Sequence, residues 1–371
     1  MNDNLFTYLK WRGDLSFKEA KFNEVDNLIL ANLAYIRLTN VLEDNINAKA
    51  VSIYDAYQQF IALPKEKRIT RDNRDPDFFK ALSESIRFKD LKLFYHHEIY
   101  DYDNSIQFGA ITIGIDDNLY YVAYRGTDSA IIGWQEDLEL AFKVVPAQKL
   151  AHEYLLNISE HFNKAHFYVG GHSKGGNLAT YAASKLSKDK QERIIAIFNN
   201  DGPGFDNTIV DEKQFTSISD KIYNYVPESS VVSVIFTQYG QETVIDSSSI
   251  SILQHDPYSW LIEGGHFIKA LKRDKFSDFM RTSINNCLNN IPYNQKAAFA
   301  DGVFKVIYAS KAQTLQEIIP CMLKNFKDVQ GALNTLDEKT KDTISLVFGE
   351  IFSSLGQSFN EHFLKGIIHK E

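Results

Sequence analysis

The sequence predicts an α/β fold in which a mainly parallel sheet is flanked by helices, with a helical extension toward the C-terminal end. Three observations support this prediction. Short apolar runs alternate with helix-length segments, a glycine-flanked serine stands between one such run and a helix-like segment, and the chain beyond Phe267 reads as helical. Alternating strands and helices are typical of parallel sheets with crossover helices.

The N-terminal part of the chain predicts helices. Apolar side chains recur at helical spacing over residues 24–36, and neither glycine nor proline interrupts this segment. Residues 51–92 are also read as helical, but polar, with a loop of mixed charge in the middle. We therefore expect helices to precede the sheet.

Strands are predicted where the chain becomes rich in β-branched and aromatic side chains, from residue 92 to residue 125. Asp-Asp-Asn at 116–118 is a turn sequence between two apolar runs, so we expect an antiparallel hairpin there. Further strands, separated by helix-length segments, are expected at residues 167–169, 194–198, 221–226 and 242–245. Their spacing favours parallel pairing.

The motif Gly-His-Ser-Lys-Gly at residues 171–175 lies between an apolar run and a small-residue segment that reads as the start of a helix. A Gly-x-Ser-x-Gly turn between a strand and a helix is the nucleophile elbow of α/β hydrolases. Glycines flank the serine there because its backbone is strained and side chains beside it would strike the neighbouring strand and helix. The motif predicts an α/β-hydrolase fold with Ser173 as a covalent nucleophile.

A serine nucleophile needs a base, and in α/β hydrolases the histidine comes last in chain order. His255 is the preferred candidate because it stands on a loop after the strand predicted at residues 242–245. His266, which follows two glycines, is the alternative. The two histidines near the C-terminus fall on the polar side of a predicted amphipathic helix, which suits solvated residues.

The histidine needs a carboxylate to fix its tautomer, and two candidates stand directly after predicted strands. Asp201 opens a turn after the strand at residues 194–198, and Glu228 follows the next strand. Catalytic groups gather at the carboxyl ends of such strands. Asp201 is preferred and Glu228 remains the alternative acid.

The oxyanion of a tetrahedral intermediate needs two hydrogen-bond donors. The residue after the nucleophile supplies one, here the backbone N–H of Lys174. The second is expected from the loop after an early strand, where Thr127 can offer both its N–H and its hydroxyl. Thr127 and Lys174 are therefore the predicted oxyanion hole.

Several motifs together resemble a known group of enzymes. Tyr-Arg-Gly-Thr-Asp at 124–128, Gly-Trp-Gln-Glu-Asp-Leu at 133–138 and the Gly-His-Ser motif are similar to the pattern of class 3, fungal-type lipases. The chain resembles more closely an uncharacterised bacterial family related to them. That likeness rests on Phe-Asn-Glu-Val-Asp at 22–26, Asp-Gly-Pro-Gly-Phe at 201–205 and Gln-His-Asp at 254–256.

This resemblance implies Ser173 as nucleophile, His255 as base, and Thr127 with Lys174 in the oxyanion hole. It implies an acid one strand later than Asp201, where this chain has Glu228. It also implies that the segment 129–140 corresponds to the lid of those lipases, although a fixed helix is an equal interpretation. The reasoning from the residues therefore favours Asp201 as the acid, whereas the resemblance points to the position of Glu228.

The composition of the chain limits which binding partners and which cellular location we expect. A net charge of −8 and interleaved acidic and basic residues argue against nucleic-acid binding. Two cysteines are too few for a disulfide framework and lack zinc-site spacing, so no metal site is expected. Neither a leader sequence nor an apolar run of membrane-spanning length is recognised, which predicts a cytoplasmic protein. An apolar stripe over residues 344–367 could support peripheral membrane contact.

Together these features predict a serine hydrolase that cleaves a small-molecule acyl ester or lipid through an acyl-enzyme, without a cofactor. A thioesterase or amidase would use the same residues, because a fold does not determine its substrate. A non-catalytic binding or scaffold protein on the same fold is the alternative from another class. We expect a hydrolase core with N-terminal helices over residues 1–275 and a helical extension packed on it over 276–371.

Overall fold

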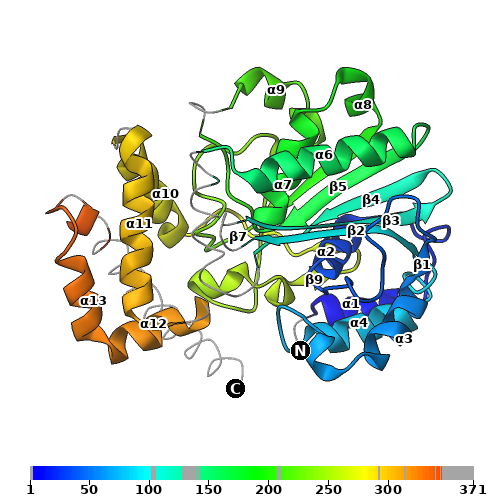
Figure 1. Ribbon diagram of the computed structural model, residues 1–371, viewed down its shortest axis with the longest axis horizontal. Helices are drawn as coiled ribbons and strands as arrows, with labels where there is room; N and C mark the ends of the chain where they lie inside the picture. The colour runs from blue at the N-terminus through cyan, green and yellow to red at the C-terminus, as the bar shows by residue number, and fades with distance from the viewer. Residues whose placement is uncertain are drawn as a thin grey trace.

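A computed structural model describes residues 3–101, 106–127, 140, 143–206, 210–290, 293–312, 315–338, 340–342 and 344. An eight-stranded sheet forms its centre (Figure 1). The strands, in both spatial and chain order, are β1 (Val51–Ser52), β2 (Lys92–Asp101), β3 (Ile106–Asp116), β4 (Leu119–Tyr124), β5 (His166–His172), β6 (Ile194–Asn200), β7 (Ile222–Pro227) and β8 (Gln241–Ile245).

The sheet has an antiparallel half and a parallel half. Strands β1 to β4 pair antiparallel, and β3 and β4 form the hairpin that the Asp-Asp-Asn turn predicts. Strands β4 to β8 pair in parallel. Because parallel neighbours end at the same edge, the loops that follow β4, β5, β6 and β7 lie side by side.

Helices cover both faces of the sheet (Figure 1). On one face lie α1 (Leu5–Arg12), α2 (Glu24–Leu33), α3 (Ile53–Ala62) and α4 (Asp75–Glu84). On the other face lie α6 (Pro146–His161) and α7 (Lys174–Ser184), with the short α8 (Lys188–Glu192) and α9 (Glu212–Thr216) beyond them. A small hairpin of β9 (Ile262–Glu263) and β10 (His266–Phe267) follows the sheet.

The core is divided by the sheet into two apolar layers. Along β4, Tyr121 and Ala123 pack into the layer of the N-terminal helices, whereas Tyr120 and Val122 pack into the layer of α6 and α7. Successive side chains of a strand point to opposite faces, so a strand that is apolar throughout can be buried on both sides. This double burial explains why β4 and β5 lack the polar alternation of a half-exposed strand.

The N-terminal helices differ slightly from their sequence prediction. Helix α2 ends at Leu33 rather than at residue 36, and the segment 51–92 contains the two-residue strand β1 besides its helices. The motif at residues 22–26 begins α2 with a capping box, in which Asn23 accepts from the Asp26 N–H and Asp26 accepts from the Asn23 N–H. Asp26 also pairs with buried Arg87 at 2.5 Å. This motif therefore has a structural explanation.

Helices α10 (Lys275–Asn290), α11 (Tyr293–Ala309), α12 (Leu315–Lys324) and α13 (Phe326–Leu333) follow the sheet and lie to one side of it (Figure 1). Side chains of α11, α12 and α13 share a separate apolar cluster. Buried Lys296 of α11 pairs with Asp206 at 2.5 Å, and Asn285 of α10 bonds to the backbone of Phe236. These contacts tie the helices to loops of the sheet, while the division at residue 275 stays a prediction.

The architecture is that of an α/β hydrolase, as the sequence predicts. A mixed, mainly parallel sheet carries helices on both faces, and a sharp strand-to-helix turn holds Ser173 between β5 and α7.

A buried histidine on β2 predicts an acid-sensitive fold. His96 is 3% exposed, and burial, the main cause, lowers the pKa of His96 from the usual 6.5 to about 4. Above pH 6.5 the side chain is neutral in the folded and the unfolded chain. Below pH 6.5 the unfolded chain binds a proton that the folded chain does not. We expect His96 to remove roughly 3 kcal/mol of unfolding free energy between pH 6.5 and pH 4.

Denaturant unfolding from pH 7.5 to pH 4 checks this expectation. The His96→Gln variant lacks the titrating group, so its unfolding free energy should decrease less with acid than that of the wild type. His166→Gln, at an exposed position at the start of β5, is the control and should follow the wild type. Equal acid sensitivity of His96→Gln and wild type would contradict the prediction.

Candidate active site

Ser173 occupies a strained turn between β5 and α7. Its backbone has φ +59° and ψ −131°, outside the regions that a residue other than glycine usually adopts. A Cβ on Gly171 would lie 2.4 Å from the carbonyl carbon of Gly175, and a Cβ on Gly175 would lie 2.1 Å from the Tyr124 carbonyl oxygen. Only glycine fits at both positions. The motif is therefore a sterically required elbow that holds the Ser173 hydroxyl beyond the end of β5.

Three side chains from separate loops meet at this turn. Nε2 of His255 lies 3.0 Å from Oγ of Ser173, and Nδ1 of His255 lies 2.6 Å from Oδ2 of Asp201. Ser173 follows β5, Asp201 follows β6, and His255 ends a 3-10 helix, Ser251–His255, after β8. The sequence separates these residues widely, and the parallel sheet brings them to one edge.

The carboxylate determines which nitrogen of His255 carries the proton. Because Asp201 can only accept when ionised, Nδ1–H of His255 donates to it, and Nε2 then accepts the Ser173 hydroxyl proton. Asp201 is fully buried, Ser173 is 2% exposed and His255 is 8% exposed. A buried hydrogen bond to a carboxylate is stronger than the same bond in water. The geometry is that of a nucleophile with an oriented base.

Asp201 is itself held in an unusual conformation. Its φ is +53°, a left-handed value, and its N–H donates to the Tyr225 carbonyl at 2.9 Å. Oδ1, the carboxylate oxygen that does not face His255, accepts from the Ser230 hydroxyl at 2.5 Å. Strained backbone at buried polar residues is common in functional sites. Both carboxylate oxygens of Asp201 thus have donors.

The two alternative residues make other contacts. Glu228 follows the end of β7, where its N–H donates to the Ile245 carbonyl and its carbonyl accepts from the Asp274 N–H. His266 is on β10 with a side chain that is 75% exposed, and its Nδ1 lies 3.5 Å from Glu24. The carboxylate at Nδ1 of His255 is that of Asp201, and the imidazole at Ser173 is that of His255.

The predicted oxyanion residues belong to the elbow itself and to the loop that follows the neighbouring strand β4. Lys174 is the first residue of α7, and N–H groups at a helix N-terminus point outward along the helix axis, as an anion site requires. Thr127, 5% exposed, follows the end of β4, the strand whose Tyr124 pairs with Gly171 of β5. Lys174 thus begins the helix that follows β5, and Thr127 follows the strand that pairs with β5.

The loop that carries Thr127 is anchored by Arg125. This buried guanidinium pairs with Glu98 of β2 and donates to the Phe108 carbonyl of β3 at 3.2 Å. Glu98 also accepts from Thr39 at 2.5 Å. The arginine of the Tyr-Arg-Gly-Thr motif thus fastens the loop to two strands, a positioning contact that the sequence does not reveal.

His172, beside the nucleophile, is a further residue that sequence reasoning missed. Its Nε2–H donates to the His255 carbonyl at 2.8 Å, and its Nδ1 accepts from the Tyr35 hydroxyl at 2.8 Å. Burial, followed by the nearby His255 and Arg71, holds the pKa of His172 well below its usual range. A neutral His172 therefore fixes the backbone of His255. The motif contains this histidine, but only the fold reveals its partners.

Some predicted features lie outside the described residues. The proposed lid, residues 129–140, is described only at Leu140, and the apolar stripe over 344–367 only at Ile344, which is buried against α11, α12 and α13. Among the described residues, no helix combines the length and apolar character needed to cross a membrane. The described part also contains no cluster of three or more acidic, histidine or cysteine side chains suited to a metal ion.

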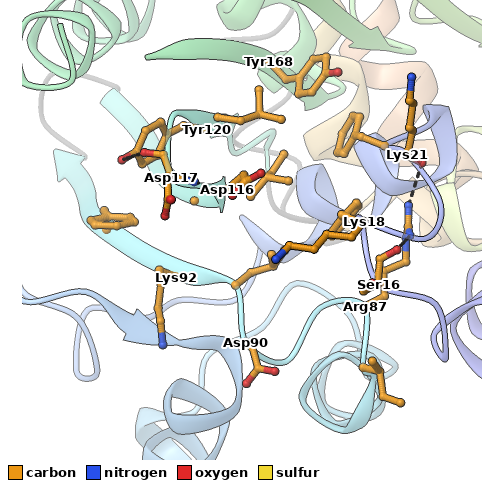
Figure 2. A pocket seen from close by; sticks show the side chains of 18 residues that line it. Ser16, Lys18, Lys21, Arg87, Asp90, Lys92, Asp116, Asp117, Tyr120 and Tyr168 are labelled. Atoms are coloured by element: carbon orange, nitrogen blue, oxygen red, sulfur yellow. Dashed lines mark hydrogen bonds between the residues drawn. The ribbon is translucent and has the colours of Figure 1, made fainter. Parts of the chain in front are cut away.

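A pocket of about 930 Å³ lies at the opposite end of the strands (Figure 2). Asp116 at the end of β3 and Asp117 in the following turn line it together with Tyr168 near the start of β5. Lys18 and Lys92 also line it, so its charges are mixed (Figure 2). Because Ser173 follows the far end of β5, this pocket is separate from the candidate active site.

Solved structures that resemble the chain include fungal lipases. The Rhizomucor miehei lipase propeptide complex is 16% identical with a TM-score of 0.34, and the match covers 57% of this chain and 76% of that one. The Lip2 lipase from Yarrowia lipolytica is 15% identical with a TM-score of 0.34, covering 60% and 78%. A mutant form of MDLA from Penicillium cyclopium is 13% identical with a TM-score of 0.40, covering 68% and 87%. Such low values support no inference about activity.

Family membership follows from the sequence match. No curated protein matches the chain significantly. The model of the Mbeg1-like family, in contrast, matches residues 82–305, which include Ser173, Asp201 and His255. That range covers the sheet from β2 to β8 and more than half of the chain. The protein therefore belongs to the Mbeg1-like family.

Proposed function

We propose that the protein is a serine hydrolase that cleaves carboxylic esters of lipids or other acyl compounds through an acyl-enzyme. One observation supports this above all: the hydroxyl of Ser173, on a strained elbow, lies 3.0 Å from an imidazole that is oriented by a buried carboxylate. Ser173 is the nucleophile, His255 the general base and Asp201 the orienting acid.

In the first half-reaction, Nε2 of His255 takes the Ser173 proton as Oγ attacks the carbonyl carbon of the ester. The carbonyl π electrons move to the oxygen, and the oxyanion accepts from Lys174 N–H and Thr127. The intermediate then collapses. The bond to the leaving oxygen breaks, that oxygen takes the proton from His255, and the acyl group remains on Ser173.

In the second half-reaction, water takes the place of the leaving alcohol. His255 removes a proton from water as the water oxygen attacks the acyl carbon. The bond between the acyl carbon and Oγ of Ser173 then breaks, and His255 returns the proton to Oγ. The products are an alcohol and a carboxylic acid. Asp201 keeps Nδ1 protonated in both halves and stabilises the imidazolium, so no step needs a metal ion.

The preference for lipid or acyl esters rests on the motifs that resemble class 3 lipases. Thioester and amide cleavage use the same residues, so the leaving group is a matter for substrate screening. A series of p-nitrophenyl esters from acetate to palmitate, together with one acyl thioester and one anilide, separates these substrate classes. Ser173→Ala protein is the blank for every substrate.

A fluorophosphonate probe tests the proposal directly. Only an activated serine reacts at a useful rate, because the hydroxyl of an ordinary serine is a weak nucleophile. We expect one probe molecule per chain, and peptide mass spectrometry should place it on Ser173. Absence of labelling under conditions that label a known serine esterase would favour the scaffold protein that keeps a hydrolase fold without catalysis.

A further inference from the structure

A row of buried hydroxyl groups leads from the Asp201 carboxylate to an arginine. The Ser230 hydroxyl donates to Oδ1 of Asp201 at 2.5 Å, and the Ser233 hydroxyl donates to Oγ of Ser230 at 2.7 Å. Nη2 of Arg273 donates to Oγ of Ser233 at 3.1 Å. Each of these hydrogen bonds joins neighbouring members of one chain of four residues.

The residues at the two ends of this row determine the direction in which its hydrogen bonds donate. Arginine can only donate and an ionised carboxylate can only accept, so each hydroxyl between them accepts from the Arg273 side and donates toward Asp201. The backbone N–H of Ser233 also donates to Oγ of Ser230 at 3.1 Å. Ser230 therefore has its hydroxyl proton directed at the carboxylate.

This row of hydrogen-bonded side chains lies entirely inside the protein. Ser230 and Ser233 are each 2% exposed, Arg273 is 4% exposed, and Asp201 is fully buried. Water does not compete for these groups, and hydrogen bonds that run in one direction polarise one another in such surroundings. A hydrogen bond to a charged acceptor is also stronger than one between neutral groups.

Arg273 is anchored at the far end. Its guanidinium forms two bonds to Glu242 of β8, from Nε at 3.1 Å and from Nη2 at 2.9 Å. Ser277 of α10 accepts from Nη1 of Arg273 at 3.3 Å and donates to the Ser230 carbonyl at 2.7 Å. The loop after β7 is thus fastened to β8 and to α10, which holds the backbone of Ser230 in place.

We propose that Ser230, Ser233 and Arg273 are positioning residues for the hydrolysis proposed above, and that they hold the Asp201 carboxylate with Oδ2 facing His255. A carboxylate on a single bond can rotate, and the left-handed backbone of Asp201 needs external support. With Oδ1 held by Ser230, Oδ2 stays at Nδ1 of His255. The tautomer of His255 that accepts the Ser173 proton is thereby maintained.

Steady-state kinetics on p-nitrophenyl butyrate test this role. Ser230→Ala should lower kcat about tenfold, the order of one hydrogen bond to a charged group, with KM unchanged because Ser230 does not touch substrate. Ser229→Ala is the matched control. Ser229 is on the same loop and 4% exposed, but its hydroxyl donates to Asp274. Its kcat should stay within about twofold of the wild type, since its hydroxyl bonds to Asp274 and not to Asp201.

A double-mutant cycle separates positioning from simple loss of stability. The Ser233 hydroxyl reaches Asp201 through the Ser230 hydroxyl. Ser233→Ala should therefore lower kcat less than Ser230→Ala, and the double variant should be no slower than Ser230→Ala alone. Independent structural damage would instead multiply the two losses. Melting temperatures of all variants identify any protein that is not folded at the assay temperature. If Ser230→Ala is not folded there, the kcat of Ser233→Ala is compared with that of Ser229→Ala instead.

Three results would overturn the inference. They are a kcat of Ser230→Ala equal to that of Ser229→Ala, multiplied losses in the double variant, and a loss that appears in KM instead of kcat. Failure of the proposed function is recognised separately, because an unlabelled wild type, or an Asp201→Asn variant with full activity, would refute catalysis by this triad whatever the serine variants do.

Discussion

Replacement of Ser173 by alanine is expected to abolish both fluorophosphonate labelling and ester hydrolysis. The change removes one hydroxyl from a buried turn and leaves the backbone able to form the elbow, so the fold should persist. His255→Ala should lower turnover to nearly the same level, because members of a triad act as a unit and their losses do not add. Turnover of the two single variants and of the double variant, with melting curves for each, measures this.

His266→Ala is the control for this prediction. Its side chain is 75% exposed and belongs to the β10 hairpin, so its loss should change turnover little. Labelling that survives in Ser173→Ala would refute the assignment of the nucleophile. A His266→Ala protein that is slower than His255→Ala would transfer the role of base to His266.

Asp201→Asn is expected to cost about ten-thousand-fold in turnover, the size of the analogous change in serine proteases. An asparagine amide can donate to Nδ1 of His255, which favours the tautomer with the proton on Nε2. Nε2 then cannot accept from Ser173. The substitution keeps the size of the side chain, and comparison of turnover with the melting temperature separates the tautomer effect from lost stability.

Glu228→Gln is the matched control for the acid, since it neutralises the other carboxylate that follows a neighbouring strand. Its turnover should remain close to that of the wild type. A nearly active Asp201→Asn beside a crippled Glu228→Gln would reverse the assignment. Similar modest losses in both variants would mean that the two carboxylates share the role.

The elbow could be predicted from the sequence because its cause is local. A side chain at Gly171 or Gly175 would clash with neighbouring backbone atoms, so both positions require glycine. This requirement is visible in the sequence as the Gly-x-Ser-x-Gly motif. The parallel strands were predicted for a similar reason, since apolar runs between helix-length segments are read without knowledge of the fold. The bounds of α2 and the two-residue strand β1 were less predictable, because tertiary contacts determine where short elements end.

The sequence favours Asp201 as the acid but leaves Glu228 as an alternative. Asp201 and Glu228 both follow parallel strands that end at one edge of the sheet, and chain order permits either. The choice depends on the direction in which each loop leaves its strand. The left-handed backbone at Asp201 and the Ser230 hydroxyl aim its carboxylate at His255, and neither feature has a sequence signature.

The sequence by itself determined the fold class, the position of Ser173 and the preference for His255, because steric need at the elbow, strand periodicity and chain order are properties of short segments or of their order. Only the tertiary structure decided which partners meet. It brought Tyr35 to His172, Arg125 to Glu98, and Ser230 to Asp201. These pairs are far apart along the chain, and their contacts depend on strand register and helix packing, which no local pattern encodes.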